Sequence, residues 1–255
     1  MKIVSWNVNS LRVRLPHVLD WLESAKPDVL ALQETKMTDE NFPAEEIKEA
    51  GYHVVFSGQK TYNGVAIIST SEATDIVTDV PDLDDPQRRI LAATVDGVRI
   101  IDLYVPNGQS VDSEKYPYKL NWLEKVTDYI ELQLKEHNEL VVLGDYNIAP
   151  DDRDCHDPEA WGEEVLCSKP ERAAFEKLIG LGLVDTFRMF EQEDRSFSWW
   201  DYRQMAFRRK RGMRIDHVLA STALAEKCKE GSIDTEPRKL ERPSDHAPAI
   251  AVFDR

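Results

Sequence analysis

The stretch ELVVLGDYNIAP, residues 139–150, joins an apolar run to a polar end. Four consecutive apolar residues, 140–143, are typical of a strand covered on both faces. Gly144 follows, and we interpret it as the residue that lets the backbone turn tightly. Side chains alternate along a strand, so Asp145 and Asn147 are predicted to point the same way. A buried strand therefore delivers a carboxylate and an amide to one edge of a sheet.

Further runs of the same kind recur along the chain. Strands are predicted over 2–8, 28–33, 52–57, 64–70, 139–144, 214–220 and 247–253. Residues 91–106 read as a hairpin that turns at Asp96-Gly97. Apolar stripes at helical spacing predict helices over 12–24, 117–136 and 170–181, the last with Pro170 in its first turn. We expect an α/β protein whose sheets are covered by helices, folded as one domain.

Composition limits the classes of function. No apolar run approaches the roughly 20 residues that cross a membrane, so we expect no membrane partner. The N-terminal MKIVSWNVNS does not read as a signal peptide, and three cysteines without metal or redox spacing favour the cytoplasm.

The charge is uneven along the chain. A net charge of −15 argues against a polyanionic partner. The bases of 208–214 suit such a partner, although a solvated loop is an equally good interpretation of them. The acidic stretch 151–164 is expected to face solvent, away from any nucleic acid.

Polar side chains collect where the predicted strands end. They are Asn7, Asn9, Glu34, Tyr104, Asn107, Asp145, Asn147, Asp216, Asp245 and His246. Ligands of helix-covered sheets bind beyond strand ends. Carboxylates and amides without a cysteine cluster suit a hard cation, Mg²⁺ or Mn²⁺. With one histidine they suit attack of water on a phosphodiester.

Each of these residues also has a purely structural interpretation. Taken singly, an Asp or Asn at a strand end is more often a turn or cap residue. Asp245 fits a turn cap in PSDHAP, and His246 fits a satisfied core histidine. Asp216 is harder to explain in this way, because a buried carboxylate is costly without a partner.

At these residues the chain resembles the exonuclease III family of abasic-site (AP) endonucleases, within the endonuclease/exonuclease/phosphatase superfamily. The matching segments, in chain order, are KIVSWNVNSLR (2–12), PDVLALQETK (27–36), YNGVAI (62–67), LYVPNG (103–108), LVVLGDYNIAP (140–150), LGLVDTFR (181–188), FSWWDYR (197–203), GMRIDHVLAS (212–221) and PSDHAPAIAVF (243–253). The resemblance implies a four-layered α/β sandwich of two packed mixed sheets flanked by helices.

The resemblance also implies an activity. It is metal-dependent hydrolysis of phosphodiester bonds in double-stranded DNA that carries abasic sites, nicks or blocked 3′ ends, by a monomer. Incision 5′ of abasic sites, 3′–5′ exonuclease and 3′-phosphatase activity would share one site. By the family pattern Glu34 binds the metal, Mg²⁺ or Mn²⁺, with Asn7 nearby and Asp245 as a second candidate ligand.

The remaining roles also come from the family pattern. Asp145 and Asn147 would orient or activate the attacking water, and Asp216 would hold His246 at the scissile phosphate. A charged His246 leaves Asp145 as the base, whereas a neutral His246 allows the roles to reverse; we favour Asp145. Substrate contacts are expected from Tyr104, Asn9, Asn107, Trp199, Arg203, Met205, Phe207 and Met213.

One segment bears on specificity. EVLCSKPER, 164–172, corresponds to a loop beside the lesion pocket, where a bulky Leu166 would restrict internal abasic sites and leave 3′-end trimming intact. Two other functions compete with DNA repair: a phosphodiesterase for RNA tails, sphingomyelin or inositol phosphates, and a non-catalytic nucleic-acid binder. The aromatic and basic segment 197–216 favours DNA, and the competent residues at every matched catalytic position argue against a pure binder.

Overall fold

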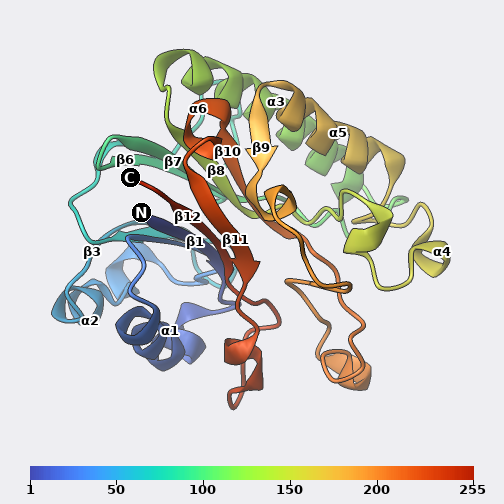
Figure 1. Cartoon of the computed structure of the whole chain (residues 1–255), viewed down its shortest axis with the longest axis horizontal. Coiled ribbons are helices and arrows are strands. Elements are labelled where there is room, and N and C mark those ends of the chain that lie inside the picture. Colours follow the sequence, from blue (N-terminus) through green and yellow to red (C-terminus); the bar gives the residue numbers. More distant parts are fainter.

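The computed structural model describes all 255 residues and contains two mixed β-sheets that pack face to face between outer helices (Figure 1). The first sheet has the order β11-β12-β1-β2-β4-β3, with β1 (Lys2–Asn7), β2 (Val29–Gln33), β3 (His53–Ser57), β4 (Val65–Ser69), β11 (Cys228–Ile233) and β12 (Ala249–Phe253). The second has the order β5-β6-β7-β8-β10-β9, with β5 (Thr74–Val77), β6 (Ile90–Val95), β7 (Val98–Tyr104), β8 (Leu140–Asp145), β9 (Leu183–Asp185) and β10 (Asp216–Ser221). The predicted four-layered sandwich is confirmed.

The chain forms six helices. They are α1 (Leu11–Ala25), α2 (Ala44–Glu49), α3 (Lys115–Glu136), α4 (Pro158–Trp161), α5 (Lys169–Gly180) and α6 (Thr222–Ala225), with 3₁₀ turns at Asp39–Asn41, Asp152–Asp154, Thr186–Met189, Arg203–Met205 and Glu236–Lys239. In Figure 1, α1 and α2 lie outside the first sheet, and α3 and α5 outside the second. No helix is both long enough and apolar enough to cross a bilayer.

The core lies between the sheets. One cluster of 20 buried apolar residues includes Ile3 and Ala31 from the first sheet, and Leu91 and Val141 from the second. These come from the nearly continuous apolar strands, whose other faces pack under the helices, as a sheet buried on both faces requires. Both sheets are therefore held rigidly against each other, and their strand ends keep a set relative position.

Most elements lie where the sequence predicts them, including the 91–106 hairpin and the three long helices. Three strands were missed: β5, β9 and β11. β9 is only three residues long, and β5 and β11 lie at sheet edges with exposed polar side chains. Such edge strands lack the apolar pattern that marks a buried one.

Gly144 corrects one expectation about the opening stretch. It lies inside β8 with φ +147°, and a Cβ at this position would come within 1.9 Å of the carbonyl oxygen of Leu103 on β7. Its role is therefore close approach of two strands and not a turn. The turn comes at Asn147, which has φ +49°.

The charged runs also differ from expectation. Arg208 to Arg211 are exposed, but Arg214 is buried and precedes β10, which begins at Asp216 and not at residue 214. Arg214 Nε donates to Asp154 Oδ1 at 2.7 Å, and its Nη2 donates to Asp185 Oδ2 at 2.8 Å. Asp154 thus faces the interior, unlike the exposed acids around it in 151–164.

This buried network predicts a pH-dependent contribution to stability. Burial raises the pKa of Asp154, but Arg214 and Arg188 outweigh it and hold that pKa below its usual range. Replacing Asp154 with Asn leaves a buried guanidinium undercompensated, and we expect a loss of about 3–5 kcal/mol in the free energy of unfolding at pH 7.

Because the folded-state pKa is lowered, this contribution is complete above the unfolded value of about 4 and declines as pH falls through the folded value. Urea unfolding of wild type and Asp154→Asn at pH 7 and pH 3 measures it. A difference that does not shrink at pH 3 would contradict the assignment.

Candidate active site

The strand registers bring polar residues to one end of both sheets. In the second sheet, Tyr104 of β7 pairs with Asp145 of β8, which in turn pairs with Asp216 of β10. In the first sheet, Asn7 of β1 pairs with Gln33 of β2, and Glu34 follows. Two rows of polar side chains therefore meet where the two sheets end.

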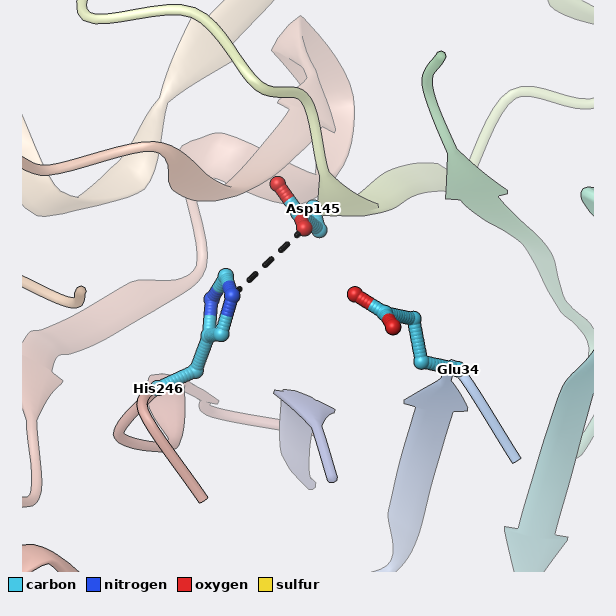
Figure 2. Close-up of side chains that lie close together, drawn as sticks. All are labelled: Glu34, Asp145 and His246. Carbon is cyan, nitrogen blue, oxygen red and sulfur yellow. Dashed lines mark ion pairs between the residues drawn. The ribbon is translucent and has the colours of Figure 1, made fainter. Parts of the chain in front are cut away.

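Three side chains converge at the meeting point, Glu34, Asp145 and His246 (Figure 2). One oxygen or nitrogen of each lies within 4.8 Å of the corresponding atoms of the other two. His246 Nε2 is 3.7 Å from Asp145 Oδ2. Two carboxylates and an imidazole from three separate segments are a set that can hold a divalent cation.

His246 is oriented from behind by Asp216. Its Nδ1 is 2.8 Å and 3.1 Å from the two carboxylate oxygens of Asp216. Burial alone would lower the pKa of His246, but the charges of Asp216 and Asp145 raise it to about 10. The neighbouring carboxylates therefore favour the charged form of the imidazole.

Asp145 is almost completely buried. Its Oδ2 accepts from Asn7 Nδ2 at 2.9 Å, and its Oδ1 accepts from the backbone N–H of Asn147 at 2.9 Å. Burial and the repulsion of the Asp216 charge raise the pKa of Asp145 to about 7, although the attraction of His246 opposes this rise. Asp145 is thus a carboxylate that takes up a proton far more readily than an exposed one.

Glu34 is held in an unusual backbone conformation, with φ +53°. Asn7 Nδ2 donates to its Oε1 at 2.9 Å, and Lys36 Nζ lies 2.8 Å from its Oε2. Burial would raise the pKa of Glu34, but Lys36 and Asn7 lower it. Burial and the Glu34 and Asp145 charges in turn raise the pKa of Tyr104.

Asp245, the second candidate metal ligand, is held by two side-chain hydrogen bonds. Both of its oxygens accept hydrogen bonds, one from Asn9 Nδ2 at 3.0 Å and one from Trp199 Nε1 at 3.1 Å. It does not belong to the converging group. Asn7 presents its amide nitrogen to the two carboxylates, while its oxygen accepts from the backbone of Asn9, so its contacts position the carboxylates.

Two asparagines line the other side of the site. Asn147 is buried, and its Nδ2 donates to Val105 O at 3.0 Å. Its Oδ1 accepts from Nδ2 of the exposed Asn107 at 2.9 Å. Beside them a cavity of about 650 Å³ is lined by residues that include Tyr62, Tyr104, Asn107 and Arg89.

The residues predicted to contact substrate divide into two groups. Trp199 is half-buried and bridges Met213 and His246 through the backbone, and Arg203 and Met205 are exposed. Met213 has no exposed surface, and Phe207 packs its ring on Trp200, 5.0 Å between centroids. The Met213 side chain is thus buried, contrary to its expected contact with substrate, whereas Phe207 is only partly buried and its contact with substrate stays a prediction.

Sequence reasoning missed several residues that complete the site. Lys36 pairs with Glu34 and donates to Asn9 Oδ1 at 2.6 Å. The guanidinium of Arg89 lies 4.7 Å from the centre of the Tyr104 ring. Lys36 stood inside the quoted QETK segment, but nothing in the sequence singled out Arg89, whose partner is contributed by another strand.

The comparisons with known proteins agree with this geometry. The model of the endonuclease/exonuclease/phosphatase family matches residues 4–246. The chain is 39% identical to exodeoxyribonuclease III of Haemophilus influenzae, over 99% of this chain and 100% of that protein.

Two solved structures share the whole fold, each covering 100% of both chains. One is a 3′ phosphatase from Neisseria bound to a product DNA hairpin, with a TM-score of 0.98 and 50% identity. The other is an AP endonuclease from Archaeoglobus fulgidus, with a TM-score of 0.97 and 41% identity. The chain belongs to the endonuclease/exonuclease/phosphatase family, and within it to the exonuclease III-like AP endonucleases.

Proposed function

We propose that this chain is a DNA-repair phosphodiesterase that uses a divalent cation, Mg²⁺ or Mn²⁺, and direct attack of water on phosphorus. Incision 5′ of abasic sites, 3′–5′ exonuclease and 3′-phosphatase activity would share one site. The observation that carries the proposal is the convergence of Glu34, Asp145 and His246 at one end of the two sheets, with Asp216 behind the histidine.

The donor set fits a hard cation. Oxygen ligands suit Mg²⁺ and Mn²⁺, and the raised pKa of Asp145 marks a buried carboxylate whose charge the protein compensates only in part. Glu34 would hold the cation, next to Asp145. When bound, the cation neutralises charge on the phosphate and on the departing 3′ oxygen.

The other residues supply proton transfer and charge. Asp145, with a pKa of about 7, is suited to remove a proton from the attacking water. The water oxygen bonds to phosphorus as the bond from phosphorus to the 3′ oxygen breaks. A charged imidazole cannot act as base, so His246 is assigned to stabilise negative charge on the phosphate oxygens, with Tyr104 and Asn107 as further contacts.

DNA is the proposed substrate for two reasons. The exposed Arg203 and Met205 begin a segment that ends in the exposed bases Arg208 to Arg211, a surface suited to phosphate contacts beside a site. The similar Neisseria protein was solved with a product DNA hairpin.

The alternative function is 3′-end trimming with little incision at abasic sites. Leu166 favours it, because it lies with Met213 in a small buried cluster against which Trp199 packs. By the family resemblance a flipped abasic sugar is expected beside Trp199, and an internal site must be unstacked to enter.

Loss of the Glu34 carboxylate is expected to abolish catalysis and leave DNA binding. Glu34→Gln keeps the size of the side chain, so we expect a rate loss of about 100-fold or more with Mg²⁺. The assay uses a labelled duplex with one abasic-site analogue and a duplex with a 3′ phosphate.

EDTA should abolish wild-type cleavage, and Glu131→Gln, an exposed change on α3, serves as the control. Cleavage by Glu34→Gln at the wild-type rate on both duplexes would refute the assigned site.

The charge on His246 predicts a descending limb at high pH in the pH–rate profile of the enzyme. Activity should fall as pH rises through the pKa of His246, because only the imidazolium stabilises the phosphate. Asp216→Asn removes the main charge that raises this pKa, so the descending limb should move to lower pH. Rates of 3′-phosphate release between about pH 6 and about pH 10.5 test this. An unmoved limb in Asp216→Asn would show that the imidazole charge is not required.

The alternative function predicts an asymmetric effect at Leu166. Leu166→Ala should raise incision at an internal abasic site relative to release of a 3′ phosphate, because it empties space beside Trp199. Leu240→Ala, at an exposed leucine, is the control. Equal and fast wild-type rates on the two substrates would rule out the alternative of trimming with little incision.

A further inference from the structure

Another buried ion pair lies next to the site and has no part in the chemistry proposed above. Lys119 of α3 and Glu171 of α5 contact each other through Lys119 Nζ and Glu171 Oε1, and neither side chain has any exposed surface. A fully buried ion pair costs desolvation free energy that its own attraction often does not recover. Its presence therefore calls for an explanation other than stability.

The ammonium group is directed at the site backbone. An ammonium has three N–H donors. Beyond its bond to Glu171, Nζ of Lys119 donates to Asn147 O at 2.6 Å and to Asn107 O at 3.2 Å. The two carbonyls belong to the asparagines whose side chains bond each other at the site. The buried ammonium group of Lys119 thus bonds the main chain at both Asn107 and Asn147.

The carboxylate is directed at the loop that carries Leu166. Glu171 Oε1 accepts from the backbone N–H of Leu166 at 3.0 Å, and Oε2 accepts from the backbone N–H of Ser168 at 3.2 Å. Leu166 has φ +79°, a conformation that a leucine adopts only when its surroundings hold it there. The Leu166 carbonyl oxygen accepts a hydrogen bond from Ala149 N at 2.8 Å. This bond connects the Leu166 loop to the segment that contains Asp145 and Asn147.

Gly108 lies close to the aliphatic stem of Lys119. A Cβ on Gly108, which has φ +88°, would come within 3.1 Å of Lys119 Cδ and 3.2 Å of Val165 Cγ2. The Asn107 turn therefore lies close to both the aliphatic stem of Lys119 and Val165, which precedes Leu166.

We infer that Lys119 and Glu171 are a positioning pair, which sets the two asparagines and the Leu166 loop relative to each other and so couples the catalytic geometry to substrate choice. The inference rests on the proposed function. A shift of about 1 Å in a positioned group is enough to cost about 100-fold in rate, so such a pair acts on catalysis without touching substrate.

Lys119→Met removes the donor and keeps the length of the stem. We expect kcat for 3′-phosphate release to fall about 10- to 100-fold, with KM changed less than about threefold because the exposed DNA contacts remain. The melting temperature should fall by about 10 °C, since Glu171 is left buried and unpaired. Lys135→Met, which breaks the exposed Lys135–Glu131 pair on the same helix, should leave kcat unchanged.

The double variant Lys119→Met/Glu171→Gln separates positioning from stability. Neither charge remains, and the neutral amide that replaces the carboxylate can still accept a bond from the loop backbone, so most of the melting temperature should return. The carbonyls of Asn107 and Asn147 still lack their donor, so kcat should stay low. Recovery of kcat together with stability, or an unchanged kcat in folded Lys119→Met, would overturn the inference.

Hydrogen exchange distinguishes failure of this inference from failure of the proposed function. Amides in 105–109 and 164–168 should exchange faster in both variants than in wild type, whether or not the wild type cleaves DNA. A wild type without nuclease activity would refute the proposed function alone. Unchanged exchange in both segments would refute the positioning pair.

Discussion

Charge buried at one point between two sheets is the constraint on which this structure depends. Asp145, Asp216 and His246 are each no more than 4% exposed, and Glu34 lies against them. Buried charges persist only when they are paired or bonded. Asp216 pairs with His246, and Asn7 bonds both remaining carboxylates. The site is therefore a compensated cluster that still carries excess negative charge, which a cation would complete.

The fold holds this cluster of charged side chains together. Parallel pairing of β7 with β8, and antiparallel pairing of β8 with β10, place Tyr104, Asp145 and Asp216 in one row. The shared apolar core prevents the sheets from sliding, because close-packed side chains interlock across it. The first sheet contributes Asn7 and Glu34 from the opposite side. Residues distant in the sequence thus meet, as Asn7 and Asp145 do within hydrogen-bond distance although they lie 138 positions apart.

Site residues could be predicted from the sequence where they lie next to a local apolar pattern. Asp145, Asn147, Asp216 and His246 follow or begin apolar strands, so strand ends alone pointed to them, and the family resemblance gave them roles. Buried strands and amphipathic helices were predictable for the same reason, since each has its own periodicity. The edge strands β9 and β11 lack such a pattern.

The roles of residues that depend on a partner distant in the sequence could not be predicted from the sequence. Arg214 read as part of a basic surface run, yet Asp154 and Asp185 draw it into the interior. Lys119 lies in the predicted helix 117–136, but only the tertiary structure places Glu171 beside it. Both oxygens of Asp245 are taken up by Asn9 and Trp199, and no local signal shows that.

The most direct test of the central claim is the position of the cation itself. Crystals grown with Mn²⁺ and a duplex carrying a 3′ phosphate would locate the metal by anomalous scattering. The account predicts a peak coordinated by Glu34 and by a phosphate oxygen, with His246 in contact with the same phosphate, and no peak in Glu34→Gln. A cation bound away from Glu34 in crystals that still hydrolyse the 3′ phosphate would contradict it.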